Sequence, residues 1–266
     1  MTGADTAAAR ERDYLAQTFG LRGATALVTG ASRGLGAAMS IALARAGAHV
    51  CLVGRRDNLG ATRDAVVAEG GRATEVVGQL GSEADIDEVV AACEERVGPV
   101  DVLVNNAGTF VRKPAIDWTP AEWDEVMDLS TRSVFLLCQR VGRGMLERGR
   151  GKIVNIASVL AFQGGSTVPA YAASRHAVVG LTRALANEWA AAGVNVNAIA
   201  PGYIDTDLLE GLKADPVRSA ELLARVPAGR WGRPADLAGA VVFLASPASD
   251  FVHGATLAVD GGWLSR

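Results

Sequence analysis

The sequence predicts an α/β protein with a doubly wound, seven-stranded parallel sheet and helices on both of its faces. Seven short runs rich in β-branched and other apolar residues alternate with segments of helix length, and this alternation is typical of a parallel sheet. The runs are almost continuously apolar, as strands buried on both faces must be. They cover residues 24–29, 49–53, 73–77, 100–105, 152–157, 194–200 and 255–260.

Local signals place three of the helices between these strands. The segment Leu35–Ala46 lies between a glycine-rich turn and Gly47, and the segment Glu83–Arg96 follows Ser82, which is a good helix N-cap. Pro234 is expected in the first turn of a late helix, because a missing N–H group costs nothing there.

The 266 residues, 49% of them hydrophobic, can bury one large core. Because no repeat or linker-like stretch divides the chain, we expect residues 1–266 to form a single domain. Residues 1–20 are expected to be an N-terminal extension with a short helix. Ligands of open α/β sheets bind outside the carboxyl ends of the strands, so residues 205–225 are well placed to form a substrate lid.

Charge and cysteine content exclude several classes of partner. The 26 basic and 29 acidic side chains give a net charge of −3, which offers no electrostatic basis for binding nucleic acid or an anionic membrane. Three scattered cysteines suit neither a disulfide framework nor a zinc site, so we expect reduced core thiols and no metal. Without a sustained apolar span or a secretory signal, we expect a cytoplasmic protein that acts on a small molecule.

A glycine-rich motif directly follows the first predicted strand and opens the first helix. Thr29–Gly36 reads TGASRGLG. Glycines at 30, 34 and 36 let the backbone turn sharply and approach a pyrophosphate at the helix N-terminus, where free N–H groups favour anions. A glycine turn alone is a weak signal, but this strand-to-helix context favours a dinucleotide site over a plain tight turn.

The end of the second predicted strand bears on which dinucleotide is bound. NAD sites usually place a carboxylate there, whereas this chain offers Arg55 and Arg56, with Arg33 inside the glycine turn. Because bidentate arginine suits a 2′-phosphate, NADP is favoured, with NAD as the alternative. Arg55 and Arg56 could instead only solvate a helix start, and the nearby Asp57 weakens the preference.

A candidate proton-transfer group follows the fifth predicted strand. Ser158 comes directly after that strand, Tyr171 comes 13 residues later, and Arg175 comes 4 after that. Residues four apart share one face of a helix, so the phenol and the cation are expected one turn apart. The positive charge would stabilise the phenolate and make Tyr171 usable as an acid or a base. A buried tyrosine with a satisfied hydroxyl is the alternative.

Together these motifs resemble the short-chain dehydrogenase/reductase family over about residues 20–266. The resemblance rests on TGASRGLG, on NNAG at 105–108, on Ser158 and Tyr171, and on the dipeptide Pro201–Gly202. Further segments are similar to the sugar-acid branch of that family, the 2-dehydro-3-deoxy-D-gluconate 5-dehydrogenases, also called 2-deoxy-D-gluconate 3-dehydrogenases. These segments are FQGG at 162–165, VPAY at 168–171, ANEWA at 186–190, VNVNAIAPGY at 194–203, PAGRWG at 227–232 and VDGGWLSR at 259–266.

The resemblance implies a Rossmann-type fold, a homotetramer and roles for individual residues. Tyr171 would give a proton to the carbonyl in reduction and take it back in oxidation, and Ser158 would hydrogen-bond the substrate oxygen. Asn105 would line the adenosine side, and the nicotinamide carboxamide would lie near Ile204 and Thr206. The residues expected to bind the cofactor are Gly30, Ser32, Arg33, Gly34, Leu35, Gly36, Arg55, Asn105, Ala107, Gly108, Tyr171, Arg175, Pro201, Gly202, Ile204 and Thr206.

The chain departs from the family pattern at three positions. Arg175 stands where the family usually has lysine, and Ser130 stands where it usually has asparagine; both remain candidates for the catalytic group. Gln79 replaces an aspartate that commonly contacts the adenine. Arginine keeps the positive charge but does not release a proton, so we expect hydride transfer to be slower, or shifted in its pH dependence, compared with a lysine-bearing relative.

The substrate is predicted from chemistry rather than from a motif. A sugar acid needs a cation near the nicotinamide, and Arg112 is the candidate, with Arg230 and His176 behind it and Gln163 as a further substrate contact. One alternative is a dinucleotide-binding regulatory or scaffold protein with impaired redox activity. Another is a 3-oxoacyl or other ketone reductase of the same family, although the low aromatic content of 5% favours a polar substrate.

Overall fold

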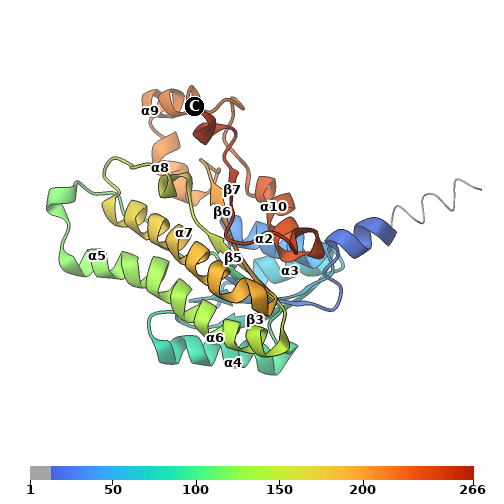
Figure 1. The fold of residues 1–266 in the computed structure, drawn as a ribbon. Helices are drawn as coiled ribbons and strands as arrows, with labels where there is room; N and C mark the ends of the chain where they lie inside the picture. Colours follow the sequence, from blue (N-terminus) through green and yellow to red (C-terminus); the bar gives the residue numbers. More distant parts are fainter. Residues whose placement is uncertain (1–12) are drawn as a thin grey trace, which may run out of the picture.

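The computed structural model describes residues 13–266, which contain one parallel sheet with helices packed on both faces (Figure 1). The strand order is β3-β2-β1-β4-β5-β6-β7. The predicted Rossmann-type fold class and all seven predicted strands are confirmed, with ends that differ by no more than two residues. The strands are β1 (Thr25–Thr29), β2 (His49–Gly54), β3 (Arg72–Val77), β4 (Val102–Asn105), β5 (Gly151–Ile156), β6 (Val194–Pro201) and β7 (Thr256–Val259).

The predicted helix starts also agree with the structure. Ser82 caps α4 by accepting a hydrogen bond from the backbone of Asp85, and Pro234 opens a 3-10 turn that leads into α10. Of the expected N-terminal extension, residues 13–19 are helical and residues 1–12 lie outside the described part. The helices are α2 (Gly34–Arg45), α3 (Gly60–Ala68), α4 (Glu83–Val97), α5 (Pro120–Met127), α6 (Ser133–Arg148), α7 (Pro169–Trp189), α8 (Glu210–Lys213), α9 (Pro216–Leu223) and α10 (Ala238–Ala245).

Two hydrophobic cores lie on opposite faces of the sheet. Helices α4, α6 and α7 cover one face, and α2, α3 and α10 cover the other (Figure 1). Side chains of β1 alternate between the two cores, with Leu27 in the first and Ala26 and Val28 in the second. This alternation follows from the two-residue period of a strand, and it explains why a strand covered on both faces is apolar throughout.

The strand order reverses direction between β1 and β4. The chain builds β1, β2 and β3 outward to one side and then returns to add β4 on the other side of β1. Loops that leave the carboxyl ends of β1 and β4 therefore diverge, which opens a crevice at this edge of the sheet. Such a switch point is where open α/β sheets bind their ligands.

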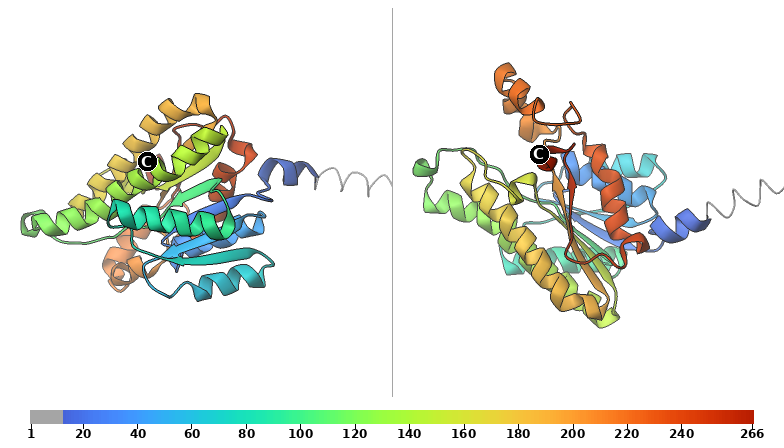
Figure 2. Two further views of the ribbon diagram at one scale, coloured as in Figure 1. Left: turned by 90° about the horizontal axis from the view of Figure 1, so that it is seen from below. Right: turned by 45° about the horizontal axis from the view of Figure 1, so that its top comes forward.

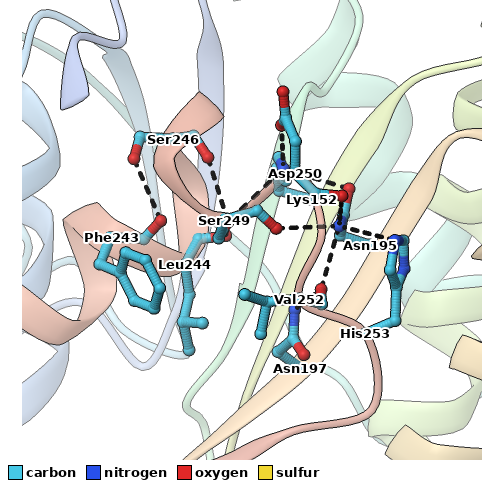
Figure 3. Close-up of polar contacts among 10 residues, drawn as sticks. All are labelled: Lys152, Asn195, Asn197, Phe243, Leu244, Ser246, Ser249, Asp250, Val252 and His253. Atoms are coloured by element: carbon cyan, nitrogen blue, oxygen red, sulfur yellow. Dashed lines mark hydrogen bonds and ion pairs between the residues drawn. The ribbon is translucent and has the colours of Figure 1, made fainter. Parts of the chain in front are cut away.

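A polar network fixes the opposite, amino-terminal edge of β5 and β6 (Figure 3). The side-chain nitrogen of Asn195 lies 3.0 to 3.1 Å from the backbone carbonyl oxygens of Ser249, Asp250 and Val252. Lys152 on the neighbouring strand donates to Asn195 Oδ1 and contacts the carboxylate of Asp250 at 2.6 Å. The segment between α10 and β7 is thereby tied to the base of the sheet.

The segment predicted to be a lid contains two short helices. Residues 205–225 hold a 3-10 turn, α8 and α9, and these helices project away from the sheet and its covering helices (Figure 2). Asp215 caps α9 by accepting hydrogen bonds from the backbone N–H groups of Val217 and Arg218. Within residues 13–266, no helix combines the length and the apolar character that crossing a membrane requires.

Helix α5 begins with a capping interaction whose contribution to stability should depend on pH. The Lys113 ammonium and the N-cap Thr119 hold the pKa of Glu122 down to about 2. A carboxylate with a lowered pKa stabilises the fold above its unfolded pKa, and this contribution is lost as the pH falls through the folded pKa. Glu122→Gln is therefore expected to unfold at a lower temperature than the wild type at pH 7, with the difference fading between about pH 4 and 2.

The unfolding temperatures of the Glu122→Gln variant and the wild type are measured by circular dichroism at pH values from 7 down to 2. Glutamine can still cap the helix, so the substitution isolates the charge. Glu125→Gln, on the exposed surface of the same helix, is the matched control. An undiminished difference between the Glu122→Gln variant and the wild type at pH 2 would contradict the assignment.

Candidate active site

The glycine-rich turn packs so closely on the start of the first helix that positions 30 and 36 do not accommodate a side chain. Gly30 adopts a positive φ of 63°, and a Cβ atom at Gly36 would lie only 2.1 Å from the carbonyl oxygen of Gly30. Helix α2 then begins at Gly34 with no side-chain cap and no acidic residue in its first turn. Its first N–H groups are therefore free to bind an anion such as a pyrophosphate.

Two adjoining cavities follow the carboxyl edge of the sheet on either side of this turn. One, of about 490 Å³, is lined among others by Gly30, Ser32, Arg33, Arg55, Ala107 and Gly108. The other, of about 250 Å³, is lined among others by Gly34, Leu35, Gly36, Ser158, Tyr171, Arg175, Pro201, Gly202, Ile204 and Thr206. Almost all of the residues assigned to the cofactor from the sequence thus lie around one continuous crevice.

Ser158 and Tyr171 line the smaller cavity from two neighbouring elements. Ser158 lies two residues beyond the end of β5 and is 8% exposed, and its hydroxyl accepts a hydrogen bond from the backbone of Leu160 at 3.1 Å. Tyr171 lies in the first turn of α7, where the edge of the Phe110 ring packs against it with the ring centroids 5.0 Å apart. A serine hydroxyl and a phenol on the wall of one cavity can both reach the oxygen of a bound alcohol or ketone.

Arg175 is buried beneath the ring of Tyr171, and one of its guanidinium nitrogens is hydrogen-bonded to the protein backbone. The carbon atom Cζ of its guanidinium lies 4.8 Å from the centroid of the Tyr171 ring, and the side chain is 5% exposed. Nη1 donates to the carbonyl oxygen of Ile156 at 2.9 Å, while Nε is buried without a hydrogen-bond partner. The cation therefore lies beside the phenol as predicted, in an orientation that this backbone contact fixes.

Ser130 lies in a single π-helical turn between α5 and α6, and it is fully buried. Its hydroxyl accepts a hydrogen bond from the backbone of Thr109 at 3.4 Å, so it contacts the loop that follows β4. A Cβ atom at Gly108 would lie 2.5 Å from Nη2 of Arg175 and 3.4 Å from Oγ of Ser130. Glycine at 108 is therefore needed for the guanidinium of Arg175 to approach this loop, whereas the contact with Ser130 would tolerate a Cβ atom.

The prediction that Asn105 lines the adenosine side is corrected by the structure. Asn105 is the last residue of β4, is 2% exposed and donates to Oδ1 of its strand neighbour Asn155 at 2.8 Å. Its side chain is turned into the core because it pairs with a second buried amide, and it lines neither cavity. Asn106, which the sequence reading passed over, lines both cavities and donates to the carbonyl oxygen of Thr29 at 2.9 Å.

The arginines assigned to a 2′-phosphate lie around the larger cavity. Arg55 and Arg56 are exposed on its rim, just beyond β2. Arg33 lines both cavities, and its Nη1 atom lies 2.5 Å from the carboxylate of Asp207, in the segment predicted to be a lid. Arg33 therefore connects the glycine turn to residues 205–225.

The residues predicted to contact substrate lie beyond the cavity walls. Arg112 packs its guanidinium over the Phe110 ring at 5.5 Å, and its Nη1 atom is 3.4 Å from the hydroxyl of Thr167. Loss of hydration lowers the pKa of Arg112, and repulsion from Arg218 acts in the same direction. Gln163 is half-buried and lines neither cavity.

Comparisons with known proteins agree with this geometry. The model of the family described as enoyl-(acyl carrier protein) reductase matches residues 30–264. The 2-dehydro-3-deoxy-D-gluconate 5-dehydrogenase of Bacillus subtilis is 49% identical over 254 residues, which cover 95% of this chain and 99% of that protein. The enzyme of the same name from Dickeya dadantii is 50% identical over 94% of this chain and 98% of its own length.

A solved structure extends the similarity to three dimensions. The gluconate 5-dehydrogenase of Burkholderia cenocepacia, in complex with NADP and tartrate, superimposes with a TM-score of 0.90 at 40% identity and covers 94% of this chain and 99% of that one. The glycine turn, the NNAG loop, and Ser158 and Tyr171 at one cavity are the features on which the resemblance rested. The chain belongs to the short-chain dehydrogenase/reductase family.

Proposed function

We propose that the protein is an NADP(H)-dependent oxidoreductase that transfers a hydride between the nicotinamide and a hydroxyl or ketone group of a sugar acid. The observation that carries the proposal is the meeting of Ser158 and Tyr171 on one cavity wall, next to a glycine turn that leaves helix N–H groups free. The names of the relatives favour a sugar-acid substrate, and the NADP in the Burkholderia structure favours that cofactor, with NAD as the alternative.

The shape of the crevice suits a nicotinamide dinucleotide, which would supply the hydride or accept it. The free N–H groups at the start of α2 would hold the pyrophosphate. Gly36 lets this helix pack directly against the carbonyl oxygen of Gly30. Arg33 and Arg55 would bind the 2′-phosphate. The remaining residues proposed to hold the cofactor are Gly30, Ser32, Gly34, Leu35, Gly36, Ala107, Gly108, Tyr171, Arg175, Pro201, Gly202, Ile204 and Thr206.

Tyr171 would move the proton that balances hydride transfer. In reduction its phenolic hydroxyl gives a proton to the carbonyl oxygen as the carbon gains the hydride, and in oxidation the phenolate takes that proton back. Ser158 would donate a hydrogen bond to the same oxygen, where charge develops in the transition state. Arg175 would stabilise the phenolate of Tyr171 from beneath the ring, and Ser130 would belong to the same catalytic group of residues. Arg112 and Gln163 would contact the substrate.

Turnover measured with both cofactors tests the proposed function. We expect purified protein to oxidise D-gluconate or 2-dehydro-3-deoxy-D-gluconate with NADP+, followed by absorbance at the wavelength of the reduced cofactor. D-Glucitol with NADP+ and 3-oxoacyl esters with NADPH serve as comparison substrates, because they separate a sugar-acid enzyme from other ketone reductases of the family. No turnover of any sugar acid in either direction, with cofactor bound, would refute the proposal.

Cofactor preference provides a second prediction. Arg55→Ala is expected to lower kcat/KM with NADP+ by about tenfold and to leave kcat/KM with NAD+ within about twofold, since each charge-assisted hydrogen bond to the phosphate is worth roughly 1.5–3 kcal/mol. Arg72→Ala, at an exposed position on the edge strand β3, is the matched control. Equal loss with both cofactors would show that Arg55 does not bind the 2′-phosphate.

One observation favours a second candidate function. The contact of Arg175 with the carbonyl oxygen of Ile156, together with serine rather than asparagine at 130, suits a dinucleotide-binding regulatory or scaffold protein with impaired redox activity. Such a protein would bind NADPH and a partner without turning over ketones. Steady oxidation of NADPH by a ketone substrate, or steady reduction of NADP+ by D-gluconate, would exclude it.

We further propose that one domain spans the chain, with residues 205–225 as a substrate lid, and that four chains assemble in the cytoplasm. The exposed edge strand β7, with Leu257 at its surface, supports assembly, and three free, buried cysteines suit a reducing compartment. Light scattering is expected to give a mass four times the 27.5 kDa of one chain.

A further inference from the structure

Three arginines from separate parts of the sequence gather beside the catalytic cavity. Arg112 comes from the loop after β4, Arg218 from the lid helix α9, and Arg225 from the two residues that follow α9. Aromatic rings hold two of them in place: the Cζ atom of Arg112 lies 5.5 Å from the Phe110 ring, and that of Arg225 lies 4.1 Å from the Trp263 ring. We call Arg112, Arg218 and Arg225 the arginine cluster.

Contacts between rings connect the arginine cluster to the catalytic tyrosine on one side. Phe110, which supports Arg112, lines the smaller cavity and packs edge-on against Tyr171. Arg112 and Tyr171 thus both contact the ring of Phe110. A substrate that places its reacting carbon at Tyr171 can extend a few carbons past Phe110 toward this cation.

On the other side, Tyr203 connects the arginine cluster to the cavity floor. Tyr203 directly follows Gly202, which lines the cavity, and its ring lies 4.7 Å from that of Trp263, on which Arg225 packs. Leu222 of α9 packs in the same small core. Positions 218 and 222 are four residues apart, so they share the face of α9 that is turned toward Tyr203, and Arg225 follows two residues after the end of this helix.

No acidic side chain of residues 13–266 forms an ion pair with the arginine cluster. Ion pairs of the described residues engage Arg33, Lys213 and Arg230 in this region, but none of them includes a member of the cluster. Burial raises the pKa of Tyr203, and all three members of the cluster oppose that shift, so each lies within electrostatic range of one phenol. Gathering like charges is unfavourable unless an anion binds between them.

We propose that Arg218 and Arg225, together with Arg112, bind the carboxylate of the substrate, so that the lid recognises the acid end while Ser158 and Tyr171 act on the distant hydroxyl. The proposal rests on the proposed function and specifies which residues make the enzyme selective for acids. Guanidinium groups suit this role because they bind carboxylates through paired hydrogen bonds. Arg218 and Arg225 then act as specificity-determining residues that lie on and just after α9 rather than on the sheet.

The arginine cluster also replaces two earlier candidates. Arg230 is held by both oxygens of Asp236, at 2.6 and 3.2 Å, so its charge is already balanced. His176 is exposed on α7, and its Nδ1 atom lies 3.0 Å from the carbonyl oxygen of Ala172. Neither side chain is available to a carboxylate in the way that the unpaired guanidinium groups are.

Paired substrates that differ only in the charged end test the proposal. D-Gluconate and D-glucitol share a carbon chain, and one ends in a carboxylate where the other ends in a hydroxymethyl group. We expect Arg218→Gln and Arg225→Gln each to lower the ratio of kcat/KM for D-gluconate to kcat/KM for D-glucitol by ten- to a hundredfold. Arg218→Lys should lose less, because it keeps the charge and loses only the paired geometry.

A binding measurement makes the test independent of turnover. D-Gluconate is titrated calorimetrically into protein saturated with NADPH, a combination that cannot react, and both glutamine variants are expected to bind it at least tenfold more weakly than the wild type. Glu221→Gln on α9 and Arg143→Gln on α6 are exposed controls, and they should bind it as the wild type does. Thermal unfolding confirms that each variant is folded.

The outcomes separate the two proposals. If the wild type binds D-gluconate no more tightly than D-glucitol, or if both glutamine variants bind it as the wild type does, the carboxylate assignment is overturned. If carboxylate binding depends on Arg218 and Arg225 but no substrate is turned over, the carboxylate site stands and the proposed oxidoreductase function fails. Turnover of D-glucitol without preference for D-gluconate would leave the oxidoreductase function and remove the carboxylate site.

Discussion

Tyr171→Phe is expected to lower kcat by about 10²- to 10⁴-fold, because a positioned general acid or base contributes on that order. The phenol and the hydroxyl of Ser158 line one cavity, and no other phenol lines it among residues 13–266. Phenylalanine keeps the ring that packs against Phe110 and Arg175, so NADPH binding, followed by fluorescence titration, should remain within about threefold of the wild type.

The matched control for this substitution is Tyr14→Phe in the N-terminal helix, where the side chain is 64% exposed. That variant should keep wild-type turnover. Retention of most of the wild-type kcat by Tyr171→Phe would assign proton transfer to another group. Loss of NADPH binding in parallel with kcat would instead give Tyr171 a structural role.

Arg175→Lys is expected to raise kcat, by about tenfold alone and by more when combined with Ser130→Asn. In the wild type, Nη1 of Arg175 is bonded to the carbonyl oxygen of Ile156 and the guanidinium does not release a proton at working pH. An ammonium group is a smaller cation with three rotatable donors, and it can pass a proton or hold a water molecule beside Ser130. The measurement is kcat on one sugar acid across a range of pH.

Arg183→Lys, exposed on the same helix α7, is the control for the exchange of charge type. Thermal unfolding should show whether loss of the contact with Ile156 destabilises the variant enough to mask the gain. A folded Arg175→Lys variant that is no faster than the wild type at any pH would show that arginine does not limit proton transfer. The slower chemistry expected from the sequence would then need another cause.

The fold was predictable because its signals are local. Continuous apolar strands, the cap at Ser82 and the proline at 234 each depend on a few neighbouring residues, and the structure agrees with all of them. The glycine turn was predictable for the same reason, since strand, turn and helix follow one another within about twenty residues. Short-range rules of this kind hold wherever the segment lies in the fold.

The site was less predictable where its residues are far apart in the sequence and are brought into contact only by the tertiary fold. Asn105 was misplaced because the direction of the last side chain of a strand depends on its neighbour Asn155, 50 residues away. The partner of Arg33 is Asp207, 174 residues away, and nothing near either residue indicates the pair. Arg218 and Arg225 belong to no motif, and only the packing of α9 on Tyr203 brings them beside Arg112.

The hydrogen-bond network around Asn195 should restrict local unfolding to the opposite edge of the sheet. It anchors the return to β7 at the amino edge of the sheet (Figure 3). Residues 205–225, in contrast, are joined to the carboxyl edge by exposed contacts such as that between Arg33 and Asp207. Amide hydrogens of β5 and β6 should therefore exchange with solvent only through global unfolding, while those of α9 exchange through local opening. Substrate can then enter and leave at one rim of a sheet whose other rim stays closed.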